Sequence, residues 1–214
     1  MTAMGTPTAT RADLTRILRD AIVSGEYAPN QRLIEADLSA SYGASRAAVR
    51  TALLELAAEG LVDRLPNRGS RVRAIPLAEA IEILEVRMSL EGLCAAKAAE
   101  NITDAEIAEF TKLRADILAA AASDLFEYSR LNQVLDRRIR EIAGHPTAVS
   151  ILERLRAQGV RHQFRLAFYP GRAAVSAPEH AAIIDAIVAR DSARAEAETR
   201  AHLGSVIQAL HTIG

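Results

Sequence analysis

Two short helical patterns joined by a sharp turn constrain the fold of this chain more than any other feature. The turn contains Gly43, which can take the left-handed conformation that ends a helix, and Ser45, a favourable N-cap for the next helix. In that second helix Val49, Leu53 and Leu56 share one face, which must be buried against neighbouring elements. The pattern predicts a helix-turn-helix.

The residues on either side of this pair predict a short first helix and a β-ribbon. We expect Ile34 and Leu38 on one face of the first helix and Tyr42 near its end. After Gly60, residues 61–65 and 70–73 alternate between apolar and charged types around a turn that contains Gly69. Two such strands would form the wing of a winged helix-turn-helix.

Arginine is concentrated in the second helix and the wing. Residues 44–73 hold six Arg against three acidic residues. Arg46 lies in the first turn of the helix and Arg50 one turn later, where a guanidinium can match O6 and N7 of guanine in a major groove. A solvated basic face is the alternative. The placement of the excess favours DNA, with predicted contacts at Arg32, Ser45, Arg46, Arg50, Arg64, Arg68, Gly69 and Arg71.

A resemblance to a known family rests on the run RLIEADLSASYGASRAAVRTALLELAAEGLVDRLPNRGSRV. It resembles the winged helix-turn-helix of the GntR family of bacterial transcription regulators. The resemblance implies that Arg46 and Arg50 contact bases and phosphates and that the wing tip reaches the minor groove. Ala47 and Ala48 replace a common Ser/Thr-Pro pair. Ala36 stands where some members have a DNA-contacting Arg, so the operator sequence does not carry over.

Charge and composition limit the function classes. The net charge of −1 excludes a general polyanion binder, although residues 1–75 hold ten Arg against eight acidic groups. Residues 76–214 hold sixteen basic and nineteen acidic groups. The single cysteine, Cys94, excludes an internal disulfide and suits a reducing compartment. With no membrane-length apolar run and no signal peptide pattern, these features predict a cytoplasmic protein with no membrane partner.

The β pattern ends at Ile75-Pro76, which is the predicted domain boundary. We expect a mainly α protein with a disordered segment at 1–9, a winged helix-turn-helix at 10–75 and an all-helical bundle at 76–214. In the first domain a helix is predicted from about Thr10 to Gly25. The predicted bundle helices are Leu77–Glu100, Thr103–Ala122, Ser123–Ala143, Thr147–Phe168, Ser176–Arg190 and Ser192–Thr212. Capping-box spacings at Thr103/Glu106 and Ser176/Glu179 mark two of the starts.

The helical half resembles the effector and dimerisation domain of the FadR-type branch of the GntR family. The matching segments are EVRMSLE at 85–91, IAGHP at 142–146, EHAAIIDAI at 179–187 and AHL at 201–203. Their order after the first domain extends the resemblance over nearly the whole chain from about Thr10. It implies a homodimer that binds double-stranded operator DNA and a small organic acid effector.

A metal site is a further implication of this resemblance. In many relatives two histidines join an Asp-x-x-x-His pair to bind a divalent metal. The histidines correspond to His180 and His202, and the pair aligns with Asn132 and Asp136. Asp136, His180 and His202, with Asn132 or water assisting, would suit Zn, Ni or Mn and leave open positions. The alternative is a pair of hydrogen-bonded core histidines and an Asp136 paired with an Arg.

Arg87 is the remaining candidate, because its helix is apolar on several sides and a buried guanidinium needs an anion. The resemblance implies that Arg87 lines the effector cavity, whereas the alternative is an internal bridge to Asp136 or Glu91. The predicted effector-binding residues are Arg87, Asn132, Asp136, His180 and His202.

Two function classes fit these patterns. The first is a bacterial DNA-binding transcription regulator, a homodimer whose operator affinity is modulated by a small carboxylate. The second is a helical metal-dependent hydrolase carrying a DNA-binding head, supported by the open metal position at Asp136, His180 and His202. The sequence contains no nucleophile elbow, no phosphate-binding Gly loop and no HExxH motif, so the prediction is a protein that is not an enzyme.

Overall fold

The computed structural model describes residues 11–65 and 69–213. The segment 1–9, predicted to be disordered, and Arg68 at the wing tip lie outside the described residues. The chain divides into two compact units, Met1–Ile75 and Pro76–Gly214, which we call the head unit and the helical unit. No described helix combines the length and the apolar character needed to cross a membrane.

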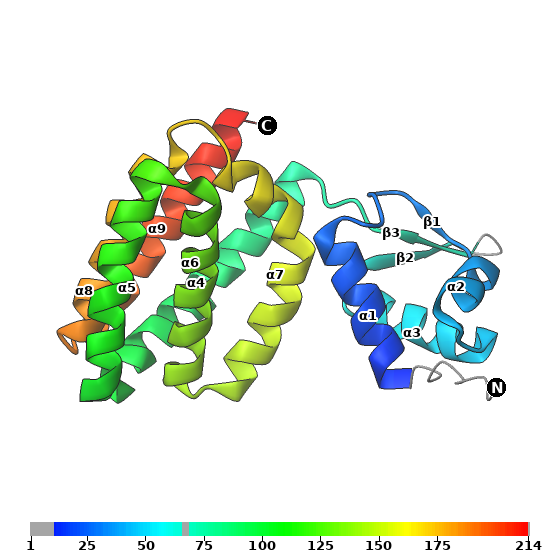
Figure 1. Ribbon diagram of the computed structural model, residues 1–214, viewed down its shortest axis with the longest axis horizontal. Coiled ribbons are helices and arrows are strands. Elements are labelled where there is room, and N and C mark those ends of the chain that lie inside the picture. The colour runs from blue at the N-terminus through cyan, green and yellow to red at the C-terminus, as the bar shows by residue number, and fades with distance from the viewer. Residues whose placement is uncertain (1–10, 66–68, 214) are drawn as a thin grey trace, which may run out of the picture. The chain divides into compact units, whose positions relative to one another are not determined.

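The head unit combines three helices with a small sheet (Figure 1). A described strand pair, β2 and β3, is extended by a third strand, so that the order is β1-β3-β2 with both pairings antiparallel. The core is apolar and includes Leu14, Leu18, Val49, Leu53 and Leu56, each at most 2% exposed. The elements are α1 (Arg11–Ser24), β1 (Arg32–Leu33), α2 (Glu35–Tyr42), α3 (Arg46–Ala58), β2 (Val62–Leu65) and β3 (Gly69–Val72).

The turn between α2 and α3 has the predicted chemistry. Gly43 ends α2 in the left-handed conformation, with φ of 61°. Ser45 caps α3 by accepting a hydrogen bond from the backbone N–H of Ala48 at 3.2 Å. The hydroxyl of Ser39 donates to the carbonyl of Ala44 at 2.6 Å and closes the turn. The orientation of α3 is therefore fixed by local bonds as well as by its buried face.

Two details of the head unit differ from the prediction. Ile34 is not on the face of the first helix: it precedes α2 in an extended conformation and is 52% exposed. The wing has a third strand, because Arg32 and Leu33 pair with Arg71 and Ser70 of β3. Two residues are too few to show the period of a strand, so the sequence pattern carried no signal for β1.

The helical unit is a bundle (Figure 1) in which α4 packs extensively on α9. Gly92 permits close approach of these two helices, since a Cβ there would lie 3.1 Å from the side chain of Glu196. The helices are α4 (Leu77–Asn101), α5 (Asp104–Ser123), α6 (Leu125–Ala143), α7 (Pro146–Ala167), α8 (Arg172–Val188) and α9 (Ser192–Ile213).

The helix starts follow their capping residues, with one error in the prediction. Thr103 and Glu106 form the predicted capping box of α5. The predicted start of α8 at Ser176 is wrong, because α8 begins at Arg172 and Pro178 lies inside it. Ser176 is buried, and its hydroxyl donates to the carbonyl of Arg172, so it is an interior residue rather than a cap. His180 consequently lies in the third turn of α8 and not in the first.

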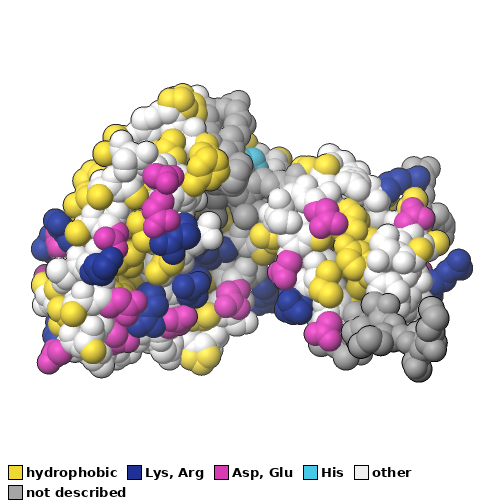
Figure 2. Space-filling view, viewed as in Figure 1, with side chains coloured by type: hydrophobic (Ala, Val, Ile, Leu, Met, Phe, Trp, Pro, Cys, Tyr) yellow, Lys and Arg dark blue, Asp and Glu magenta, His cyan; other side chains and the backbone are white. Residues whose placement is uncertain are grey.

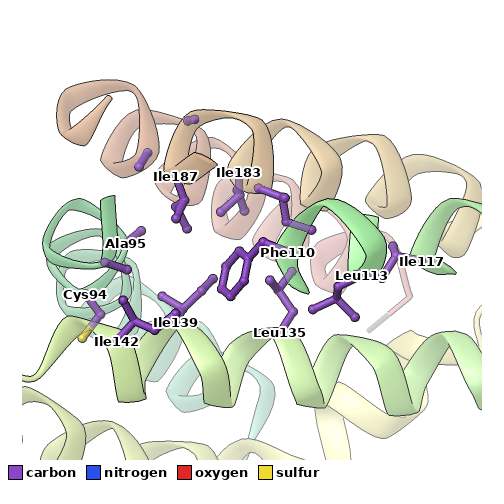
Figure 3. Packing of buried hydrophobic residues seen from close by; sticks show 14 of the residues in the cluster. Cys94, Ala95, Phe110, Leu113, Ile117, Leu135, Ile139, Ile142, Ile183 and Ile187 are labelled. Atoms are coloured by element: carbon purple, nitrogen blue, oxygen red, sulfur yellow. The ribbon is translucent and has the colours of Figure 1, made fainter. Parts of the chain in front are cut away.

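The core of the helical unit surrounds Phe110, which is fully buried. Figure 3 shows its ring between Leu135 and Ile139 of α6 and below Ile183 and Ile187 of α8. These side chains lock α5, α6 and α8 together through contact between bulky apolar groups. The same cluster continues to Cys94 and the alanines of α4.

This packing predicts that Phe110→Ala lowers the free energy of unfolding by about 3–5 kcal/mol, because it removes a large buried side chain and leaves a cavity. Urea unfolding followed by circular dichroism measures the loss. The matched control is Leu118→Ala on the same helix, since Leu118 is 37% exposed, and we expect it to cost less than about 1 kcal/mol. Equal losses in the two variants would contradict the assignment of the core.

Candidate functional site

The first candidate surface is the exposed side of α3 in the head unit. Arg46 and Arg50 are exposed, while Val49 and Leu53 on the opposite side are buried. Arg64 of β2 is exposed as well. The helix therefore presents guanidinium groups on the face that packing leaves free, as entry into a major groove requires.

Arg50 is not free on this surface. It donates from Nε and Nη2 to the carboxylate of Glu35, at 3.1 and 2.9 Å. This hydrogen bond, the largest cause, lowers the pKa of Glu35 below its ordinary value. A phosphate or base that binds Arg50 must compete with Glu35, whereas Arg46 has no such restraint among the described hydrogen bonds and ion pairs.

The sheet places two more predicted DNA contacts side by side. Arg32 of β1 lies opposite Arg71 of β3, and Asp63 of β2 lies opposite Arg71 on its other side. Arg71 donates from Nε to Asp63 at 3.1 Å, which offsets the repulsion between the two arginines. Gly69 begins β3 with φ of 82°, a conformation that glycine adopts readily. The wing thus keeps its basic groups together next to the tip.

The second candidate site is a cavity inside the helical unit, which we call the histidine cavity. Its enclosed volume is about 30 Å³, and it opens to solvent. It brings together Asp136, His180 and His202, as the sequence predicts, but neither Asn132 nor Arg87 lines it. The lining residues are Glu91, Cys94, Ala95, Leu135, Asp136, Ile139, Arg140, His180, Ile183, Thr199 and His202.

Both histidines are oriented by hydrogen bonds at Nδ1. The Nδ1 atom of His180 lies 3.2 Å from the hydroxyl of Tyr128, which is itself 2.5 Å from the hydroxyl of Ser176. The Nδ1 atom of His202 donates to Glu179 at 2.8 Å, and the two imidazole rings are 4.3 Å apart. Burial, followed by the nearby His202, lowers the pKa of His180 to about 3, so that this ring is neutral near pH 7.

The charged residues beside the histidines form a buried chain of ion pairs. Arg156 donates to Asp136 at 2.5 Å and to Glu91 at 3.3 Å. Arg87 donates from Nε to Glu91 at 2.9 Å and is 4% exposed. Burial alone would raise the pKa of Asp136, but the Arg156 guanidinium reverses the direction and holds it below its ordinary value. Asp136 is therefore ionised and already neutralised.

These contacts favour the alternatives for Arg87 and Asp136. Arg87 forms the internal bridge to Glu91 and borders a separate apolar pocket beside Ile83 and Leu166, instead of lining the histidine cavity. Asp136 is paired with Arg156. Helical periodicity predicted that Arg87 faces inward, whereas Asp136 was placed by the family resemblance alone. The sequence did not show their partners, since Glu91 and Arg156 are 65 residues apart.

The residues present do not fit a divalent metal. Among the residues with described side chains, no group of three or more His, Cys, Asp or Glu could hold one metal ion. The histidines offer two Nε2 atoms, but the nearby carboxylate of Asp136 is engaged by Arg156. The buried Oδ1 atom of Asn132 has no hydrogen-bond partner, yet an amide oxygen alone is a weak third ligand for Zn or Ni.

Sequence reasoning missed Arg140 and Arg156, which place two guanidinium groups at the histidine cavity. Both lie on helices that the sequence predicted, α6 and α7. The sequence did contain a signal for Arg140. It lies four residues after Asp136, and residues four apart share one face of a helix. Figure 2 shows basic and acidic side chains interspersed over the visible face of the helical unit, with no patch of one sign.

Each of the two units of the chain matches a known protein family profile. Residues 10–72 match the profile described as bacterial regulatory proteins, gntR family, and residues 82–205 match the FCD domain. A relative from Streptomyces ambofaciens, an HTH-type transcriptional regulator in an unstable DNA locus, is 30% identical over 95% of this chain and 86% of its own length. The chain belongs to the GntR family. Its second domain is an FCD domain.

Other relatives of this GntR-family protein include the HTH-type transcriptional repressor RspR of Escherichia coli K12. It is 27% identical over 92% of this chain and 87% of its own length. Among solved structures, Escherichia coli McbR/YncC has a TM-score of 0.76 at 22% identity and covers 94% of this chain and 97% of its own. A GntR protein of Rhodococcus sp. RHA1 has a TM-score of 0.72 at 20% identity, with 94% and 97% covered. These two structures support the mainly α fold.

The restraint on Arg50 predicts that Glu35→Gln strengthens binding of the GntR-family protein to DNA of any sequence. The variant removes one acidic group beside α3 and releases Arg50 for a phosphate. We expect a dissociation constant about two- to tenfold lower and a salt dependence steeper by about one ion. Asp20→Asn removes the same charge from the exposed side of α1 and serves as the control. Equal effects of the two variants on DNA binding would refute a specific role for Glu35.

The buried imidazole predicts a defined dependence of stability on pH. Below pH 6.5 the unfolded chain takes up a proton on His180, while the folded protein resists until pH about 3. The contribution of His180 to the free energy of unfolding is therefore fully present above pH 6.5. It decreases as the pH falls from 6.5 to about 3. From about pH 7.5 to about pH 5.5 we expect a loss of about 1.4 kcal/mol in urea unfolding with chelator present.

In the His180→Gln variant this component of the pH dependence should disappear. His211→Gln is the control, since His211 is exposed near the end of α9 and its loss should leave the dependence as in the wild type. A full wild-type pH dependence in His180→Gln would show that another group titrates.

Proposed function

We propose that this GntR-family protein is a DNA-binding transcription regulator whose operator affinity depends on a small carboxylate bound in its FCD domain. The observation that carries the first part is the arrangement of α3, which buries one face and exposes Arg46 at its start. A base-reading helix needs this combination, because packing must hold the backbone while a guanidinium reaches the base edges. RspR, a relative over 92% of this chain, carries the name of a transcriptional repressor.

A homodimer is part of this proposal. Two symmetric recognition helices would meet operator half-sites about one DNA turn apart, which a single head cannot do. The helical unit carries several exposed apolar side chains that a partner copy would cover, including Val86, Phe126 and Val175. The ring of Phe126 lies 5.0 Å from that of Phe168, so part of this apolar surface is already ordered as a pair.

The histidine cavity supports the effector part of the proposal. It is the larger of two interior pockets described here for the helical unit, and it holds ionisable side chains whose pKa values are displaced by burial and by neighbouring charges. Such a combination is typical of ligand sites. The FCD match over residues 82–205 is consistent with membership of the FadR-type branch.

A metal-dependent hydrolase is not proposed as a second function. That hypothesis rested on an open metal position at Asp136, His180 and His202. Asp136 forms an ion pair with Arg156 and is not available as a metal ligand. The relatives named above are transcription regulators.

The test is a gel-shift titration of the full-length protein, at one stated salt concentration, on its own promoter region and on random DNA. Specific binding to the promoter region is expected. Arg46→Ala should weaken it by about 1–3 kcal/mol and reduce the preference over random DNA, because it removes a base contact. The control is Arg16→Ala, an equal loss of charge on the exposed side of α1. Equal affinity of the wild type for both DNAs would overturn the proposal.

A further inference from the structure

Arg140 is the one lining residue of the histidine cavity whose charge has no described partner. It is partly buried on α6 and takes part in no hydrogen bond or ion pair with the described residues. Its neighbour Arg138 shows the contrast, because Arg138 bonds to Glu109 and Glu141 at the surface. Burial, and then repulsion by Arg156, lower the pKa of Arg140 from its ordinary value. The fold thus holds this cation in an unfavourable place.

Arg140 differs from the other charged side chains of the cavity wall in having no direct partner. Glu91 and Asp136 are the two carboxylates in the wall. Arg87 and Arg156 already bond to them. Asp136, Glu91 and Glu153 act on Arg140 only from beyond hydrogen-bonding distance. A carboxylate on a ligand would give Arg140 a direct partner.

The shape and lining of the cavity set the kind of anion. Ala95, Leu135, Ile139 and Ile183 give part of the wall an apolar surface, and the cavity opens to solvent. A guanidinium binds a carboxylate through two parallel hydrogen bonds, and this pairing is strongest where water is excluded. A small molecule with one carboxylate and a short carbon chain matches both the charge and the apolar wall.

The same observations argue against a metal as the anion-binding group. A dication would stand beside two guanidinium groups, Arg140 and Arg156, and among the described side chains no three His, Cys, Asp or Glu are placed to bind it together. Repulsion between these cations in a partly buried space is costly. In this chain the positive charge at the cavity comes from arginine.

We propose that Arg140 anchors the carboxylate of a small monoanionic ligand in the histidine cavity, and that no metal ion takes part. This inference rests on the proposed function in placing the effector within the FCD domain. It adds the residue that binds the ligand and the single charge that the ligand carries.

The experiment measures thermal stability and binding heat of the full-length protein in chelator. The probes are monocarboxylates of two to six carbons, with and without a hydroxyl group, and their uncharged amides. At least one carboxylate should raise the melting temperature in a saturable manner, while its amide does not. Arg140→Gln should weaken binding of that carboxylate by about tenfold or more, because the charged fork is lost. Arg140→Lys keeps the charge without the fork and should bind with intermediate affinity.

Two controls separate binding from folding. Arg137→Gln changes an exposed arginine on the same helix, 3.7 Å from Glu141, and should bind the carboxylate like the wild type. Without ligand, Arg140→Gln should melt at the wild-type temperature or above it, since it removes an unpaired, repelled charge. A purely structural arginine would instead lower the melting temperature when replaced.

Three results would overturn the inference: no carboxylate of the panel binds, Arg140→Gln binds as tightly as the wild type, or binding needs added zinc, nickel or manganese. A gel shift on the same preparations without carboxylate keeps this test apart from the proposed function. If promoter DNA binds specifically while carboxylates do not, the regulator stands and the anchoring role of Arg140 falls. If carboxylates bind through Arg140 while promoter DNA is not bound specifically either without or with them, the anchoring role of Arg140 stands and the regulator falls.

Discussion

A guanidinium group that is withdrawn from water needs an anion beside it, and this requirement arranges the interior of the helical unit. Arg156 reaches Asp136 on α6 and Glu91 on α4, so one cation ties three helices together. Arg87 completes the chain through Glu91. Buried ion pairs of this kind add little net stability, but the loss of one partner leaves a buried charge at a cost of about 3–5 kcal/mol. The chain therefore fixes the relative positions of α4, α6 and α7 around the histidine cavity.

The two units use arginine in opposite ways. In the head unit the apolar face of α3 is buried, and Arg46 and Arg50 remain in solvent, where they can meet a polyanion. Glu35 holds one of them in place and removes part of the positive charge until a competitor arrives. In the helical unit Arg87, Arg140 and Arg156 are wholly or partly buried, and there a charge interacts more strongly and a small anion has a larger effect. A ligand-dependent regulator needs a surface that binds DNA and an interior site that binds a small anion.

The sequence predicted those features of the fold that local chemistry controls. Gly43 and Ser45 identified the turn before α3, and Thr103 with Glu106 identified the start of α5, because capping depends on residues a few positions apart. The same rule misplaced the start of α8, since Ser176 and Glu179 have capping spacing but face the interior. The inward direction of Arg87 followed from helical periodicity, and the place of Asp136 from the family resemblance. Their partners did not, because contact between distant helices depends on packing that no local pattern records.

The account holds that an anion on Arg140 inside the helical unit changes how tightly the head unit binds DNA. Linkage requires a ligand that alters DNA affinity to bind the two DNA-binding states unequally. The most direct measurement is the dissociation constant for promoter DNA, in chelator, as the carboxylate that raises the melting temperature is added. In the wild type this constant should change until the carboxylate saturates, and in Arg140→Gln it should start at the same value and stay there at the same concentrations. An equal change in both proteins would contradict the account.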